Sequence, residues 1–547
     1  MGPAELTVVG LDAATFDVID PMLAAGELPH LRRLFERGSR GTLASTTHPL
    51  TTQAWSTMVT GVGAGHHGMW DFCERDASGY RLRLVNGSYR RAPAIWDHLS
   101  AAGRRVGIVN VPFTWPAQEV DGFLLAGLDA AAREEGMTYP RALARELHDR
   151  IGRPAFDHSF PLDDDGRVDL DHVRRACEQR VETVRWLADR FEPELLFVVF
   201  MSADHIHHLC WPEWDERGLE SRVAEVYRIL DEATGAITDL AGPDGNVMVV
   251  SDHGGGSLRG VVNLNAWLAE EGFLTYVAGR GVRSPSELGR LALYKALEQR
   301  RRLPTGLRYY LKQRLPHLRE RAHELKEFTV IDWSQTQAFS YGIFGNVVLN
   351  VRGREAQGTV EPGEEYERVR DAIAAKALEL KDPQTGEPIV KAVHRREDLF
   401  DGPEIGRIPD LLIEFDEYAW LGKGNLMSKT PTIWDTIRIA PNSKESYVGS
   451  HRPQGIVALA GPAAAQGVPL AARIEDVAPT IMYLLGEPIP STFEGRVLEE
   501  ALDGSLLDAR PPAYRDADVV AVGAVREYES SEAGEVEERL RGLGYIE

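Results

Sequence analysis

The sequence predicts an α/β fold with a central, mostly parallel β-sheet flanked by helices and with an inserted α+β cap. Short runs rich in Val, Ile and Leu recur between longer segments. Continuous apolar runs of this kind are typical of parallel strands that are covered on both faces. The intervening segments repeat apolar residues at helical spacing, as in DHVRRACEQRVETVRWLADRF. Strands that alternate with helices indicate an α/β sheet.

Six apolar runs are the predicted strands, and two long amphipathic segments are the clearest predicted helices. The strands are expected at residues 5–11, 105–111, 122–128, 194–201, 246–252 and 455–461. The helices are expected at residues 171–191 and 221–241. A short helix is also expected from residue 53, and another at the end of the chain, in GEVEERLRGLGYIE.

The chain has 547 residues, which exceeds the size at which a single hydrophobic core stops growing, so we expect a substantial insertion. The regular alternation loosens after Gly272 and returns with the apolar run at 455–461. The predicted division is a catalytic core in two parts, an inserted cap or substrate region, and a C-terminal helical tail. In that order along the chain, the boundaries are 1–271 (core), 272–442 (cap), 443–505 (core) and 506–547 (tail).

The formal net charge is −22, so a nucleic acid polymer or an anionic membrane is not an expected partner. The basic residues are concentrated in the segment 280–326, which fits either a solvated helical face or a positively charged lip that attracts an anionic substrate or surface. The three cysteines form no CxxC pair. No signal peptide or run of about 20 apolar residues is visible, so we expect a cytoplasmic protein without a membrane span. The oligomeric state stays open.

Potential metal ligands follow three of the predicted strands. Asp12 follows the first strand, Asp204 follows the run at 194–201, and Asp252 with His253 ends the run at 246–252. In open α/β sheets, ligands bind at the carboxyl ends of the strands, which open onto a shared crevice. His208 lies four residues after Asp204, so a helix brings both to one side. Taken alone, Asp12 could be an N-cap, and Asp204 with His208 could form a surface hydrogen bond. Asp252 and His253 could be the end of a strand before a glycine-rich turn.

Thr51 and Thr52 lie just before a predicted helix, where a threonine hydroxyl commonly caps the free backbone N–H groups. The same place suits a nucleophile, because a helix N-terminus stabilises a phosphate placed against it. A threonine hydroxyl attacks well only when a metal or a base lowers its pKa. Both interpretations are compatible.

Three common catalytic motifs fail or are missing. The GxGxxG match at residues 63–68 follows a helix-like run and not a strand, so it does not indicate a dinucleotide site. The sequence contains neither a GxxxxGK[ST] phosphate loop nor a GxSxG nucleophile elbow. The second absence disfavours the usual serine hydrolase chemistry.

The segments VVGLDAAT, HPLTTQAW, MSADHIHH, VVSDHGGG and GSHRPQG, in this order, resemble the alkaline phosphatase superfamily. The resemblance is closest to its type I phosphodiesterase and nucleotide pyrophosphatase branch. It implies two divalent metal ions, usually zinc, with manganese also suited to the ligands. Thr51 lies nine residues before the Thr60-Gly61 pair, which is the position of the attacking threonine in that family. The implied ligands are Asp12, Thr51, Asp252 and His253 for one metal, and Asp204, His208 and His451 for the other.

The expected function is therefore a two-metal hydrolase that cleaves phosphodiester or pyrophosphate bonds of a small anionic phosphoester through a phosphothreonine at Thr51. A phosphomonoesterase or phosphonate hydrolase, or a transferase that delivers the phosphoryl group to an alcohol, would use the same site. A metal-binding module without activity is the remaining alternative. Trp55, Trp70 and Phe72 could stack on an ester substituent or pack in the core. Arg452 could bind a third phosphoryl oxygen or form a surface salt bridge.

Overall fold

The computed structural model describes residues 4–76, 79–131, 136–152, 168–242, 244–277, 331–424, 432–435, 447–516, 523–543 and 545–546. Within them, nine strands form the central sheet, in the order β20-β2-β19-β9-β1-β8-β5-β6-β7. Their bounds are Pro469–Arg473, Gly38–Ala44, Gln454–Ala460, Asn246–Val250, Leu6–Leu11, Leu195–Phe200, Val106–Val109, Gly122–Leu125 and Thr138–Tyr139.

The middle of this sheet is parallel. β9, β1, β8, β5 and β6 are paired in parallel, and β2 pairs in parallel with β20. β19 runs antiparallel between β9 and β2, and β7 is antiparallel to β6. The predicted α/β fold with a mostly parallel sheet is therefore confirmed.

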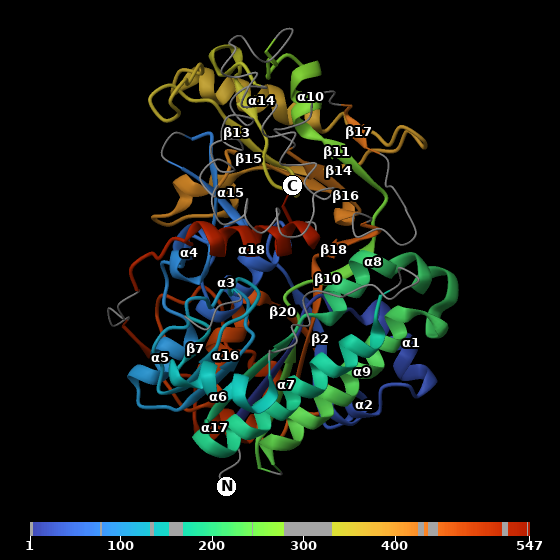
Figure 1. The fold of residues 1–547 in the computed structure, drawn as a ribbon, viewed down its shortest axis with the longest axis vertical. Helices are drawn as coiled ribbons and strands as arrows, with labels where there is room; N and C mark the ends of the chain where they lie inside the picture. Colours follow the sequence, from blue (N-terminus) through green and yellow to red (C-terminus); the bar gives the residue numbers. More distant parts are fainter. Residues whose placement is uncertain are drawn as a thin grey trace, which may run out of the picture.

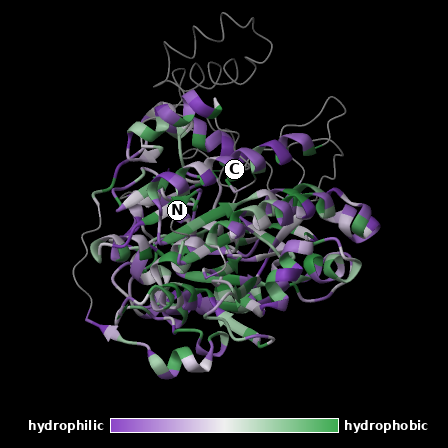
Figure 2. Cartoon of the chain, turned by 90° about the horizontal axis from the view of Figure 1, so that it is seen from below, coloured by the Kyte–Doolittle hydropathy of each residue, from purple (hydrophilic) through white to green (hydrophobic). Residues whose placement is uncertain are grey.

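Helices cover both faces of the sheet (Figure 1), and the strands alternate their side chains between the two layers. In β1, Leu6 and Val8 belong to one core cluster, and Val9 and Leu11 belong to the other. The first cluster contains side chains from α3 (Thr51–Thr60), α5 (Ile95–Ala101) and α16 (Val477–Leu484). The second contains side chains from α1 (Phe16–Ala25), α2 (Pro29–Glu36), α7 (Leu170–Phe191), α8 (Ser202–Arg217) and α9 (Arg222–Thr238). Figure 2 shows the apolar strands inside this body.

All six predicted strands lie in the sheet, and the two long predicted helices are α7 and α9. The sequence did not reveal β2, β20 or β7. β2 reads GSRGTLA and is only partly buried, and β20 is an edge strand that alternates exposed and buried residues. Neither strand carries the continuous apolar run that marks a strand buried on both faces.

A second group of strands and helices lies beside this body (Figure 1). A four-stranded sheet has the order β12-β13-β15-β14, and a three-stranded sheet has the order β16-β11-β17. Their bounds, in these orders, are Ala338–Phe339, Asn346–Leu349, Leu411–Phe415, Val390–Arg395, Trp420–Lys423, Gly260–Asn263 and Trp434–Asp435. Side chains of helices α10 (Leu264–Glu270) and α14 (Glu364–Ala377) pack with these strands in a third hydrophobic core cluster.

The division into core, cap and tail stays a proposal. β11 and α10 precede residue 272 yet belong to this second group. The basic segment 280–326 lies outside the described residues, so neither interpretation of it is tested.

Further helices and strand pairs complete the fold. They are α4 (Ala64–His67), α6 (Ala142–Ile151), α15 (Arg396–Leu399), α17 (Gly504–Ala509), α18 (Ser530–Gly542) and the pairs β3–β4 (Cys73–Arg75, Leu82–Leu84) and β21–β22 (Ile489–Pro490, Tyr514–Arg515). No helix in the described part of the chain is long and apolar enough to cross a membrane.

A two-stranded ladder packs closely against helix α8. β10 (Gly254–Ser257) pairs antiparallel with β18 (Gly449–Arg452), so that Gly255 faces His451. A Cβ on Gly449 would lie 2.2 Å from the backbone oxygen of His207, and a Cβ on Gly255 would lie 2.2 Å from its Nδ1. These two glycines therefore let the ladder approach α8.

We predict that Gly449→Ala destabilises the protein by about 1–3 kcal/mol, because the new methyl group overpacks a rigid backbone contact. Thermal unfolding measures the effect. Gly406→Ala is the control, since a Cβ there meets no heavy atom within 4 Å, and its unfolding temperature should match that of the unmodified protein. Equal stability of the two variants would contradict the packing argument.

Candidate active site

The candidate site lies at the carboxyl ends of three adjacent parallel strands, β9, β1 and β8. Asp12 directly follows β1, Asp252 lies two residues past β9, and α8, which carries Asp204, begins just after β8. The arrangement follows from the topology, because the carboxyl ends of neighbouring parallel strands meet at one edge of a sheet. The structure thus brings together residues from segments that are about 190 and 240 positions apart.

Asp204, His208 and His451 form the first cluster. Oδ1 of Asp204 lies 3.2 Å from Nε2 of His208 and 3.2 Å from Nε2 of His451. The two Nε2 atoms lie 3.1 Å apart. Asp204 and His451 are almost completely buried, and His208 is 8% exposed.

Backbone carbonyls fix the tautomers of both histidines. Nδ1 of His208 donates to the carbonyl of Gly449 at 3.0 Å, and Nδ1 of His451 donates to the carbonyl of Pro49. A carbonyl only accepts, so each Nδ1 carries the proton and each neutral ring keeps a lone pair on Nε2. Two lone pairs and a carboxylate oxygen therefore converge on one point.

Asp12, Asp252 and His253 form the second cluster, and all three are fully buried. Nε2 of His253 lies 3.3 Å from Oδ2 of Asp252 and 3.6 Å from Oδ1 of Asp12. Nδ1 of His253 donates to the carbonyl of Gly254 at 3.0 Å, which again leaves the Nε2 lone pair facing the carboxylates. The rings of His253 and His451 stack at 3.7 Å, so the two clusters adjoin.

Both clusters fit a divalent metal ion. Oδ2 of Asp252 and Nε2 of His253 are buried and accept no hydrogen bond from any described residue, which costs free energy unless something fills the site. Carboxylate oxygens and neutral imidazole nitrogens are ligands of zinc and manganese. In each of the three histidines, the ring N–H that donates to a carbonyl leaves the other nitrogen free to bind a metal, which is the usual arrangement of metal-binding imidazole.

Electrostatics within the clusters point the same way. Burial and the nearby charge of Asp204 raise the pKa of the Asp252 carboxyl well above its ordinary value. Burial alone would also raise the pKa of Asp204, but the charge and hydrogen bonds that His208 and His451 supply when protonated, and that a bound cation would replace, hold it well below its ordinary value. Buried carboxylates that face each other repel, and a bound cation relieves that repulsion.

Thr51 is the first residue of α3 and is completely buried. Its hydroxyl therefore lies at the end of a helix whose free N–H groups favour an anion. The preceding loop is tied to the first cluster, because Pro49 accepts the hydrogen bond from His451. Thr52 is equally buried, so burial does not distinguish the two threonines.

Three contacts at the site were not predicted. Nε1 of Trp55 donates to Oδ2 of Asp12 at 2.8 Å, and the backbone N–H of Ala13 donates to Oδ1 of Asp252 at 3.4 Å. The hydroxyl of Tyr545 donates to Oδ2 of Asp204. The position of Trp55, one helical turn after Thr51, could have indicated a contact at the site. Nothing in the sequence around Tyr545 indicated one.

The other residues considered from the sequence have structural contacts. Trp55 packs against Phe197, and Phe72 stacks on Tyr545. Arg452 donates to the backbone carbonyls of His451 and Ser257. Adjacent strand residues point to opposite faces, so the guanidinium of Arg452 faces away from the first cluster. This position does not suit the proposed contact with a third phosphoryl oxygen.

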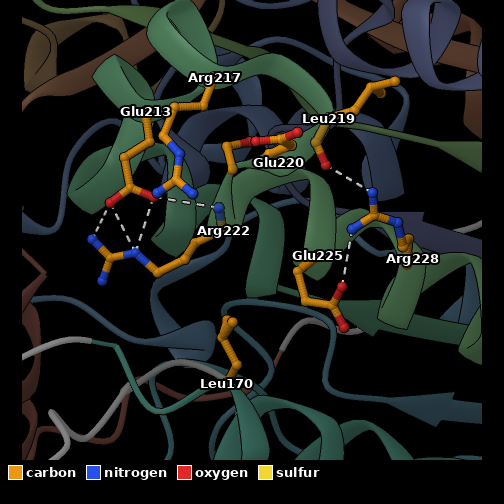
Figure 3. A pocket seen from close by; sticks show the side chains of 9 residues that line it. Leu170, Glu213, Arg217, Leu219, Glu220, Arg222, Glu225 and Arg228 are labelled. Carbon is orange, nitrogen blue, oxygen red and sulfur yellow. Dashed lines mark hydrogen bonds and ion pairs between the residues drawn. The ribbon is translucent and has the colours of Figure 1, made fainter.

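A surface hollow of about 450 Å³ lies at the opposite end of α8 from Asp204. Figure 3 shows two pairs of opposite charges in it, Arg222 with Glu213 and Arg228 with Glu225. Arg222 binds Glu213 at 2.9 Å through Nε, and Arg228 binds Glu225 at 3.0 Å. The first pair joins α8 to α9, the second lies within α9, and none of the seven predicted site residues lines the hollow.

Known proteins resemble this chain in sequence and in fold. The family model described as type I phosphodiesterase / nucleotide pyrophosphatase matches residues 6–451. A search of curated protein sequences returned no matching relative. Phosphonoacetate hydrolase from Sinorhizobium meliloti 1021, solved with phosphonoformate, is 16% identical over 89% of this chain and 95% of its own, with a TM-score of 0.53. Murine ectonucleotide pyrophosphatase/phosphodiesterase 5 is 14% identical over 91% of this chain and 100% of its own, with a TM-score of 0.48.

At these identities the likeness to phosphonoacetate hydrolase shows a shared fold. The family match is the stronger finding, because it spans more than three quarters of the chain, from the first strand of the sheet to His451. It confirms the resemblance inferred from the motifs. The chain belongs to the type I phosphodiesterase and nucleotide pyrophosphatase family of the alkaline phosphatase superfamily.

Proposed function

We propose that the protein is a two-metal hydrolase that cleaves phosphodiester or pyrophosphate bonds of small anionic phosphoesters through a covalent intermediate on Thr51. The observation that carries the proposal is the convergence of two buried acceptor clusters beside a threonine at a helix N-terminus. One metal would be held by Asp12, Thr51, Asp252 and His253. The other would be held by Asp204, His208 and His451.

The metals are proposed to be zinc, with manganese as the alternative for the same oxygen and nitrogen ligands. When bound, such a pair of cations lowers the pKa of a coordinated hydroxyl and stabilises the entering and leaving oxygens of an in-line displacement. The chain supplies the orientation. Trp55 and Ala13 hold Asp12 and Asp252, and three backbone carbonyls hold the histidines.

In the first step, Oγ1 of Thr51 loses its proton to solvent and attacks phosphorus, the bond to the leaving oxygen breaks, and the leaving group takes a proton from solvent and departs as the alcohol or phosphate. In the second step, water loses a proton and attacks phosphorus of the phosphothreonine, and the bond between phosphorus and Oγ1 breaks while Oγ1 takes up a proton to regenerate Thr51. The N-terminus of α3 stabilises the negative charge of the phosphoryl oxygens in both steps.

A preference for diesters fits the position of Arg452, since its guanidinium is held by backbone carbonyls and not directed to a third phosphoryl oxygen. A cytoplasmic location is also proposed, and three cysteines that form no disulfide among the described residues fit a reducing compartment.

We predict that Thr51→Ala lowers kcat/KM toward bis-p-nitrophenyl phosphate at least about 10³-fold, because the variant lacks the nucleophile. Thr52→Ala is the matched control and should stay within about tenfold of the unmodified enzyme. Release of p-nitrophenol measures both. Equal activity in the two variants would disprove the assignment of Thr51.

The protein is expected to bind two metal ions per chain, one in each cluster. Asp252→Asn and Asp204→Asn should each reduce this to one, because each removes a charged ligand from a different cluster. Elemental analysis after zinc loading and desalting gives the count, with the exposed Asp508→Asn as the control. Two ions in both cluster variants would contradict the ligand assignment.

Removal of the metals should lower the thermal unfolding temperature by several degrees, because ions that bind only the folded chain stabilise it. The measurement compares zinc-loaded protein with chelator-treated protein, and added zinc should restore the original value. An unfolding temperature that does not respond to the chelator or to zinc would contradict tight binding in the buried clusters.

Zinc- or manganese-loaded enzyme should release p-nitrophenol at least about tenfold faster from bis-p-nitrophenyl phosphate and p-nitrophenyl thymidine monophosphate than from p-nitrophenyl phosphate. Faster release from the monoester would replace the diesterase assignment by a phosphomonoesterase or phosphonate hydrolase. Formation of a new ester when an alcohol is added would identify a transferase.

A further inference from the structure

We propose that Tyr545 is a positioning residue of the active site, which orients Asp204 for its metal and makes the segment 523–546 part of the catalytic machinery. The inference rests on the proposed function, since it takes Asp204 as a metal ligand. Tyr545 lies far along the sequence from the other site residues, and neither the family motifs nor its neighbours in the sequence assign it a role.

The contact that carries the inference is the hydrogen bond from the Tyr545 hydroxyl to Oδ2 of Asp204. The other carboxylate oxygen, Oδ1, faces Nε2 of His208 and of His451 at 3.2 Å each. The hydroxyl thus fixes the rotation of the carboxylate and leaves Oδ1 for the metal. Such outer contacts set the geometry and basicity of a metal ligand.

Aromatic packing holds the Tyr545 ring in this place. The ring stacks on Phe72 with centroids 4.5 Å apart and planes inclined by 15°. It also packs edge-on against the rings of His208 and His451, with centroids 5.9 Å and 6.1 Å apart. Tyr545 is only 1% exposed, so its hydroxyl has few alternative directions.

The preceding helix anchors the tyrosine to the central sheet. Val536 and Leu540 of α18 are buried in the same core cluster as Tyr545. Nη1 of Arg539 donates at 2.7 Å to the carbonyls of Leu128 and Ala130, which follow strand β6. Figure 1 shows α18 crossing the middle of the molecule, between the sheet and the second group of elements.

A second tyrosine in the same segment has an analogous bond away from the metal clusters. The hydroxyl of Tyr528 donates to the carbonyl of Asp129 at 2.7 Å, and its ring stacks on Trp115 at 4.7 Å. Tyr528 therefore docks the segment but does not contact any of the proposed ligands through these bonds. It provides a matched control, because Phe removes one hydroxyl from either position and keeps the ring.

The test compares Tyr545→Phe with Tyr528→Phe in the full chain. Zinc affinity is measured by competition with a chromophoric chelator, together with kcat, KM and thermal unfolding without added metal. Tyr545→Phe should bind one of two zinc ions about 10- to 100-fold more weakly, and saturating zinc should restore its kcat/KM to within a few fold of the unmodified enzyme. Tyr528→Phe should keep the original zinc affinity.

Zinc affinity equal to that of the unmodified protein in Tyr545→Phe would overturn the inference. An equal loss in both variants would also overturn it, because the effect would then come from docking of the segment and not from the bond to Asp204. If the unmodified protein bound no zinc or manganese, the proposed function itself would fail, and the two failures are thereby distinguished.

Discussion

The structure depends on a group of hydrogen-bond acceptors that are buried together in the interior. Three carboxylates and three imidazole lone pairs converge in two adjoining clusters. Buried acceptors without donors are costly, and buried like charges repel. A sequence would not keep such an arrangement for stability alone, because apolar side chains of similar volume would pack there at lower cost. The cost is explained if cations supply the missing positive charge.

The fold brings these groups together by several independent devices. Parallel strands present Asp12, Asp252 and helix α8 at one edge of the sheet. The β10–β18 ladder then brings His451 to the same place, and two glycines let it approach α8 closely. Backbone carbonyls hold the outer nitrogen of each histidine, so every ring presents the same nitrogen to its cluster. Rigid elements thus fix the geometry that metal-assisted chemistry needs.

Much of the fold and part of the site could be predicted from the sequence. Continuous apolar runs identified six strands, and the position of Asp12, Asp204 and Asp252 at strand ends followed from the rule for parallel sheets. His451 had no such local signal and was found only through the resemblance of its motif. β2 and β20 were missed because partly exposed strands lack an apolar run. Tyr545 was missed because docking of a distant segment leaves no periodic pattern.

A crystal structure of the zinc-loaded protein, with anomalous diffraction measured at the zinc edge, would locate the metal ions. Two anomalous peaks are expected. One should lie about 2.0–2.2 Å from ligand atoms of Asp204, His208 and His451, and the other at the same range from Asp12, Asp252 and His253. A single peak, or peaks outside these two clusters, would show that the proposed two-metal site is wrong.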